Sequence, residues 1–146
     1  MGGQLVSGPD GTRFASPIRF AGYAALFDRE DRGGDIIRYG AFARAVRYWR
    51  AGGLPLLWQH RPAHCIGHID SLAEDQRGLR VIGRLHEDAH EAVAALKERR
   101  ISGLSFGYRV LRADGLGPRV LKDLDLMEVS LVTRPMQPGA QVHALA

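Results

Sequence analysis

The sequence predicts a mainly β fold with a few flanking helices (α+β), built on one antiparallel, barrel-like sheet of about six to seven strands. Two observations support this fold class. Short apolar or alternating runs recur along the 146-residue chain, and polar or glycine-rich turns separate them. Only two segments have the spacing of an amphipathic helix, and strands and helices do not alternate as they do in parallel α/β folds.

Six segments are expected to form strands, because each is a short apolar or alternating run bounded by turn-forming residues. They are residues 17–27, 35–38, 54–60, 65–73, 78–86 and 104–112. Residues 119–133 follow as one long bent strand or as two strands. The fourth and fifth segments are expected to form a hairpin through the polar turn at 74–77.

Two helices are expected outside the sheet. Residues 40–51 place four apolar side chains on one helical face: Phe42, Ala45, Val46 and Trp49. The pair Gly52-Gly53 would end that helix. The second helix is expected to begin at Asp88 as its cap, with Glu91 completing a capping box.

The length and composition predict one domain. Residues 1–16 are rich in Gly, Ser and Pro and lack periodicity, so they are expected to form a flexible N-terminal arm before a single domain at 17–146. No apolar run approaches the roughly 20 residues needed to span a bilayer, and no basic, apolar leader is present. No membrane partner is therefore expected. The single cysteine, Cys65, cannot form an internal disulfide, which favours a reducing cytoplasm.

The net charge of +4 does not predict nucleic-acid binding. The basic residues are dispersed, and the longest basic run is Arg99-Arg100. No basic stripe is interleaved with aromatic residues. We therefore expect no specific nucleic-acid partner.

Two histidine patterns raise the question of a metal site. His86-Glu-Asp-Ala-His90 matches the H-E-x-x-H signature of zinc proteases, which requires both histidines on one continuous helix. A helix that begins at Asp88 leaves His86 outside it, so the signature is interpreted as a coincidence. His60, His64 and His68 have four-residue spacing, but Pro62 breaks any helix between the first two. No metal and no cofactor are expected.

A second motif, G-x-S-x-G at 103–107, matches the nucleophile elbow of α/β-hydrolases. The elbow needs a helix after the serine, whereas strand-like residues follow Ser105, so that fold is rejected. A serine between two glycines on a strand is either a site or a bend in a barrel. His60 ends an apolar strand and is either a general base or an ordinary histidine. Alternation places Glu128 on a face with Leu126, Ser130 and Val132, where a partly buried carboxylate needs an Arg or His partner.

Seven segments together are similar to one protein family. They are FAGYAALFD at 20–28, GDIIRYGAF at 34–42, LPLLWQH at 54–60, IGHI at 66–69, GLRVIGRL at 78–85, ISGLSFGY at 101–108 and LMEVSLVTRP at 126–135. Their order and combination resemble the capsid maturation (prohead) proteases of tailed bacteriophages, which are distant relatives of the herpesvirus assemblins. The resemblance covers about residues 20–143.

The resemblance implies an assemblin-like fold and a serine endopeptidase. Carried over residue by residue, it makes Ser105 the nucleophile, His60 the base and Glu128 the third catalytic residue. Assemblins use a second histidine in that third place, so His68 and His143 are the rival candidates. By the same analogy, backbone N–H groups and Arg134 are candidates for stabilising the oxyanion.

The implied activity is cleavage of capsid and scaffold proteins during procapsid maturation of a phage or phage-derived particle. The implied partners are the major capsid protein and a scaffold segment as substrates, and a second copy of the chain in a homodimer. The implied location is the cytoplasm of the bacterial host, inside assembling procapsids. Two alternatives remain open: a non-catalytic module of the same fold that binds capsid or scaffold, and a zinc metalloprotease that uses HEDAH.

Overall fold

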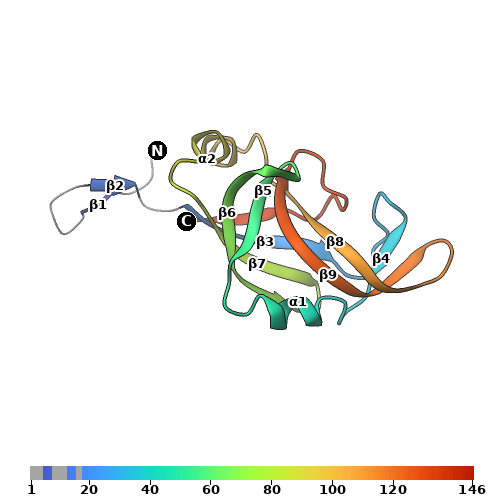
Figure 1. The fold of residues 1–146 in the computed structure, drawn as a ribbon. Coiled ribbons are helices and arrows are strands. Elements are labelled where there is room, and N and C mark those ends of the chain that lie inside the picture. Colours follow the sequence, from blue (N-terminus) through green and yellow to red (C-terminus); the bar gives the residue numbers. More distant parts are fainter. Residues whose placement is uncertain (1–4, 8–12, 16–17) are drawn as a thin grey trace.

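The computed structural model describes residues 5–7, 13–15 and 18–146. Strands β1 (Leu5–Ser7) and β2 (Arg13–Ala15) pair in antiparallel fashion and form a small sheet of their own (Figure 1). The expected arm at 1–16 therefore contains a short pair of strands. The rest of that arm lies outside the described residues.

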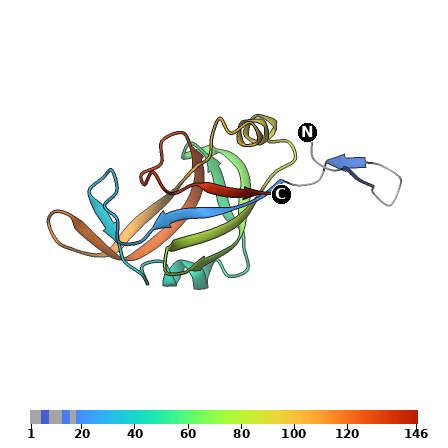
Figure 2. The same ribbon diagram turned by 180° about the vertical axis from the view of Figure 1, so that it is seen from behind.

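Eight further strands form the main sheet, which confirms the mainly β prediction. They are β3 (Ile18–Leu26), β4 (Asp35–Ile37), β5 (Leu54–Trp58), β6 (Arg61–Glu74), β7 (Gly78–Leu85), β8 (Gly103–Asp114), β9 (Arg119–Val132) and β10 (Val142–Leu145). The strand order is β10-β3-β7-β6-β5-β9, and both β4 and β8 also pair with β9. The segment at 119–133 is one long strand, and β10 was not predicted. Figure 2 shows β10 lying along β3 on the back of the molecule.

The expectation of a purely antiparallel sheet is wrong at one place. Strands β4 and β5 both run parallel to β9 and share one of its edges, β4 beside residues 119–121 and β5 beside residues 129–131. Strand β8 occupies the other edge of β9 in antiparallel fashion. The chain between β4 and β5 contains a helix, which returns it to the same edge in the same direction, as parallel pairing requires.

The ends of the sheet approach each other, which makes it barrel-like. The Leu104 N–H donates to the Ala140 oxygen at 2.8 Å, and the Val142 N–H donates to the Ser102 oxygen at 2.8 Å. Gly103 forms an isolated antiparallel bridge with Gln141 between these two bonds. The start of β8 is thereby joined to the chain that enters β10.

Helix α1 (Ala43–Tyr48) is shorter than the predicted 40–51. The Glu74 carboxylate accepts the N–H groups of Gly40 and Phe42, which stabilises a turn where the first helical residues were expected. Phe42 and Ala45 are buried as predicted, and Gly52 and Gly53 follow the helix with φ of 87° and 91°.

Helix α2 (His90–Lys97) lies at the opposite end of the barrel from α1 (Figure 1). The predicted Asp88 cap is wrong, because Ala89 is the N-cap and makes no side-chain cap bond. The Ala89 N–H donates to the His86 oxygen at 3.1 Å, so the chain is still in a turn at the position where the helix was expected to begin. Within the described residues, no helix is long and apolar enough to cross a membrane.

The core fills the barrel with the inward side chains of the strands. Leucines dominate it, and Leu54, Leu56, Leu104 and Leu131 are all fully buried. Burying one such side chain stabilises the fold by about 1.5–3 kcal/mol.

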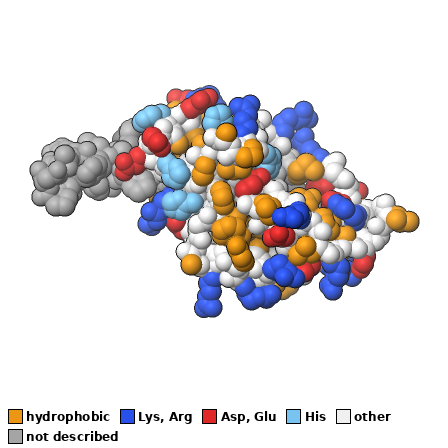
Figure 3. Space-filling model, viewed as in Figure 1, with side chains coloured by type: hydrophobic (Ala, Val, Ile, Leu, Met, Phe, Trp, Pro, Cys, Tyr) orange, Lys and Arg blue, Asp and Glu red, His pale blue; other side chains and the backbone are white. Residues whose placement is uncertain are grey.

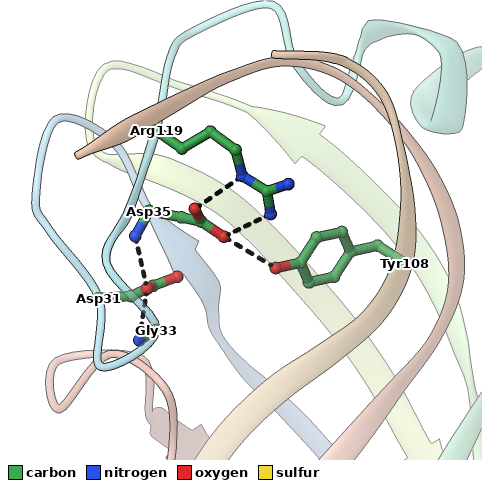
Figure 4. Close-up of polar contacts among 5 residues, drawn as sticks. All are labelled: Asp31, Gly33, Asp35, Tyr108 and Arg119. Carbon is green, nitrogen blue, oxygen red and sulfur yellow. Dashed lines mark hydrogen bonds and ion pairs between the residues drawn. The ribbon is translucent and has the colours of Figure 1, made fainter. Parts of the chain in front are cut away.

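A polar network fixes β4 to the start of β9 (Figure 4). The Asp35 carboxylate lies in a buried position and accepts two hydrogen bonds from the Arg119 guanidinium, each 3.0 Å long. The Tyr108 hydroxyl donates to the same carboxylate at 3.5 Å, and burial, followed by the charges of Asp35 and Asp31, raises the pKa of Tyr108. Asp31 accepts the N–H groups of Gly33 and Asp35 and orders the preceding loop.

Candidate active site

The register of β8 and β9 brings two of the predicted residues to one face of the sheet. Ser105 lies opposite Ser130, and Gly107 lies opposite Glu128. Directly opposed residues of antiparallel strands point to the same side, and the side alternates along each strand. The intervening residues, Leu104, Phe106, Val129 and Leu131, belong to the core. Ser105 and Glu128 therefore both lie on the outer face of the barrel.

A tight hairpin brings His60 over this face. Trp58 at the end of β5 and Arg61 at the start of β6 are cross-strand partners, which leaves Gln59 and His60 as a two-residue loop. Their φ angles are 51° and 59°. Such loops need positive φ at both positions and usually contain Asn and Gly, because other residues lose about 1–2 kcal/mol each in that conformation.

Hydrogen bonds from β9 and from the residue after it compensate for this strain. The Gln59 N–H donates to the Leu131 oxygen at 2.9 Å, and the Gln59 side-chain oxygen accepts the Thr133 N–H at 3.2 Å. The His60 N–H donates to the Ser130 hydroxyl oxygen at 3.1 Å. A strained conformation held by several surrounding bonds is typical of functional sites.

His60 and Glu128 are in direct contact. The distance from His60 Nδ1 to Glu128 Oε1 is 2.5 Å, and the imidazole is 41% exposed while the carboxylate is 13% exposed. The hydrogen bond to Glu128 raises the pKa of His60, although burial acts in the opposite direction. With Nδ1–H donating to a carboxylate, the other ring nitrogen, Nε2, is left to accept a proton.

Sequence reasoning missed the contacts of Ser130. Its hydroxyl is fully buried and donates to Glu128 Oε2 at 2.7 Å, while it accepts the His60 N–H. The signal for this contact was present, since alternation places Ser130 on the Glu128 face. The position of the His60 hairpin above that face could not be inferred from alternation.

The second glycine of the G-x-S-x-G motif makes room for Glu128. A β-carbon at Gly107 would collide with Glu128 Oε1 and would lie 2.9 Å from the Glu128 carboxyl carbon. The sequence predicted either a site or a bend at these glycines. At Gly107 the structure shows a close approach by the carboxylate that contacts His60.

Ser105 is 3% exposed, and its hydroxyl makes no hydrogen bond to the described part of the chain. Its cross-strand partner is Ser130, which contacts both His60 and Glu128. The described residues include no direct hydrogen bond between Ser105 and His60. A hydroxyl without a competing acceptor keeps its proton available to a base.

The rival third residues lie elsewhere. The His68 side chain is 3.5 Å from an Asp70 oxygen, and the His143 ring packs against the Tyr23 ring with centroids 5.8 Å apart. The contacts that the structure gives to these two histidines do not include His60. Arg134 is exposed just after β9.

The HEDAH segment does not have the geometry of its zinc signature. Helix α2 begins at His90, so His86 precedes it, and the His86 ring lies 5.6 Å from the His68 ring. Figure 3 shows histidine side chains gathered on the side of the molecule where α2 and β6 lie. Within the part of the chain that the structure describes, no three His, Cys, Asp or Glu side chains are arranged to hold a metal ion.

A phage protein is similar to this chain over most of its length. The prohead protease of Enterobacteria phage HK97 is 34% identical over 134 residues, which are 86% of this chain and 59% of that protein. The chain thus spans less than two thirds of the length of this relative.

Solved structures share the fold at low sequence identity. The bacteriophage T4 capsid assembly protease has a TM-score of 0.65 at 13% identity, covering 90% of this chain and 92% of that chain. The KSHV protease has a TM-score of 0.62 at 13% identity, covering 90% of this chain and 65% of that one. The varicella-zoster virus protease has a TM-score of 0.55 at 17% identity, with coverage of 88% and 64%. These similarities confirm the assemblin-like fold.

The family model described as caudovirus prohead serine protease matches residues 11–146, which is nearly the whole chain. This match confirms the resemblance that the seven sequence segments indicated. By this match, the chain belongs to the caudovirus prohead serine protease family.

Proposed function

We propose that this chain is a serine endopeptidase in which Ser105 is the nucleophile, His60 is the base and Glu128 orients His60. The observation that carries the proposal is the 2.5 Å contact between His60 Nδ1 and Glu128 Oε1, on the sheet face that also holds Ser105. A nucleophile, a base and a carboxylate behind the base are the three parts of this catalytic arrangement.

The chemistry proceeds in two stages. His60 Nε2 takes the Ser105 proton as the hydroxyl oxygen attacks a peptide carbonyl, and Glu128 stabilises the imidazolium that forms. The imidazolium then protonates the leaving amine, and an acyl-enzyme remains on Ser105. Water, deprotonated by His60, hydrolyses the acyl-enzyme and restores the serine.

The negative charge on the attacked carbonyl oxygen needs hydrogen-bond donors. Each donor contributes about 3–4 kcal/mol in comparable sites. Backbone N–H groups near Ser105 and the side chain of Arg134 are the proposed donors, because Arg134 is exposed two residues after the end of the strand that carries Glu128 and Ser130.

The proposed substrates are the major capsid protein and scaffold segments of a phage or phage-derived particle. The family, the HK97 prohead protease and the T4 capsid assembly protease support this assignment. The proposed location is the inside of assembling procapsids in the bacterial cytoplasm. We further propose that 17–146 is one protease domain after an N-terminal arm, and that the chain associates as a homodimer.

Co-expression with the major capsid protein of the same phage or phage-derived particle tests the proposal. The intact mass of the capsid protein should fall by one discrete segment with the unaltered chain and should stay full-length with Ser105→Ala. The matched control is Ser102→Ala, which removes a nearby serine hydroxyl that bonds to Gln141 rather than to the site.

Other outcomes separate the alternatives. A full-length capsid protein that binds the unaltered chain without being cut would make it an assembly module. Cleavage that a metal chelator stops, and that a serine-directed phosphonate leaves intact, would make it a metalloprotease.

A further inference from the structure

We propose that Ser130 is a positioning residue that holds both the base and its carboxylate in register with Ser105. This inference rests on the proposed function, because it concerns the same site. It goes beyond that function by assigning a role to a residue that does not contact the substrate.

The single proton of the Ser130 hydroxyl has one acceptor, the Glu128 carboxylate. Its oxygen accepts the His60 N–H at 3.1 Å, so the hydroxyl proton is directed to Glu128 Oε2, 2.7 Å away. Glu128 then receives one donor on each oxygen, Ser130 on Oε2 and His60 on Oε1. A carboxylate that accepts a hydrogen bond at each oxygen is held in one rotation.

Ser130 also stabilises the backbone that presents the base. The positive φ of His60 turns its N–H away from the strand ladder and toward β9. The Ser130 oxygen is the acceptor for that N–H, and burial of the serine keeps competing water away from the contact. A single hydroxyl therefore fixes the hairpin and the carboxylate at once.

The same contacts distinguish Ser130 from Ser105. Both serines lie on one face and are direct cross-strand partners. The Ser130 hydroxyl is fully buried and commits its proton to Glu128, whereas the Ser105 hydroxyl makes no hydrogen bond to the described residues. Ser105 is thus suited to attack, and Ser130 is suited to orient the groups that activate it.

The test is a pH profile of kcat/KM for the full chain on a peptide that spans the mapped capsid cleavage site. Ser130→Ala should lower kcat/KM by roughly 10- to 100-fold, the scale of losing a hydrogen bond to a charged group. The acidic limb of the profile, where kcat/KM falls as the pH drops, should move to lower pH in Ser130→Ala. The reason is that a carboxylate that is no longer held cannot keep the pKa of His60 raised. Ser130→Thr keeps the hydroxyl and should recover most of the rate.

Two controls separate this inference from the proposed function. Ser102→Ala should leave both the rate and the limb unchanged. Ser105→Ala should be inactive; if it is active, the proposed function fails. If Ser105→Ala is inactive but Ser130→Ala matches the unaltered chain, only the role of Ser130 fails.

A structural role would give a different pattern. Ser130→Ala would then lower the melting temperature and the rate without moving the acidic limb, which overturns the inference. Complete loss of activity in Ser130→Ala, equal to that of Ser105→Ala, also overturns it, because it would make Ser130 essential to the chemistry. If Ser130→Thr does not fold, the position of the acidic limb in Ser130→Ala decides between a positioning role and a structural role.

Discussion

One shielded carboxylate lies beside the start of β9 and another lies within its second half, and the partners of the two carboxylates differ. At one end, Asp35 of the neighbouring β4 is 10% exposed in its side chain and accepts two hydrogen bonds from Arg119 (Figure 4). At the other end, Glu128 is 13% exposed and takes one bond from His60 and one from Ser130. A guanidinium keeps its charge at any ordinary pH, whereas an imidazole gains and loses a proton near neutrality. The first arrangement is therefore suited to locking a strand, and the second to moving a proton.

The largest expected effect is at the proton-transfer end. Ser105→Ala and His60→Ala should each lower kcat/KM by more than about 1,000-fold, and the double variant should be little worse, because the two residues act as a unit. Peptide cleavage rates measure the loss, and melting temperatures should stay close to that of the unaltered chain. Losses that multiply in the double variant would contradict a shared role.

A smaller effect is expected where Gly107 lies beneath the carboxylate. Gly107→Ala places a β-carbon on Glu128 Oε1 and should displace it from His60, for a loss of roughly 100-fold in kcat/KM. Gly117→Ala is the control, since beyond its chain neighbours no heavy atom lies within 4 Å of the place where its methyl group would be. Equal rates for the two variants would show that Glu128 is not held against β8.

Replacing the carboxylate itself should change the pH dependence. In the proposed mechanism neutral His60 is the base, so activity should fall as the pH drops through the raised pKa of His60. Glu128→Gln removes the cause of that raise, so the acidic limb should move to lower pH, and the maximal rate should fall by roughly 10-fold or more. An unchanged rate and limb would make Glu128 structural and return His68 and His143 as candidates.

Asp35→Asn applies the same chemical change to the other end of β9. It should lower the free energy of unfolding by about 1–3 kcal/mol, because the buried side chain at position 35 loses its charge-assisted hydrogen bonds from Arg119. The acidic limb of kcat/KM should not move. Denaturant unfolding and the pH profile measure the two quantities, and a shift of the limb would mean that the two ends are coupled.

The smallest effect is expected in the HEDAH segment. His86→Ala and His90→Ala should each keep most of the activity, because α2 begins only at His90 and the two rings do not share a helical face. Elemental analysis should find less than one zinc per chain. One zinc per chain, lost in either variant, would restore the metalloprotease alternative.

Most strands could be predicted because each inward face is a local pattern. The hairpin of β6 and β7 could also be predicted, because a short polar turn joins two neighbouring runs, and these strands do pair in antiparallel fashion. The direction and partner of the other strands could not be predicted, because they depend on contacts far apart in sequence. The run LPLLW at β5 is equally apolar in either orientation, and only its pairing with residues 129–131 shows that it is parallel. Strand β10 is four residues long and depends on pairing with β3, so it has little pattern of its own.

The residues of the candidate site could be predicted, but most of the contacts between them could not. Alternation placed Glu128 and Ser130 on one face, and the family resemblance supplied Ser105 and His60. The contact between His60 and Glu128 depends on positive φ at Gln59 and His60, and this pair lacks the Asn-Gly signal that usually marks such a hairpin. The contacts of Ser130 depend on the position of that hairpin over β9, so they could not be predicted from the sequence.

The placement of Ser105 on the outside of the barrel has a consequence for how a target could be engaged. A catalytic group in an interior channel would need a free chain end to be threaded toward it. A group on the outer wall can meet the middle of a polypeptide whose two ends remain anchored. On the proposed function, this geometry allows an internal cut in a subunit that is already fixed in a shell, without releasing it first.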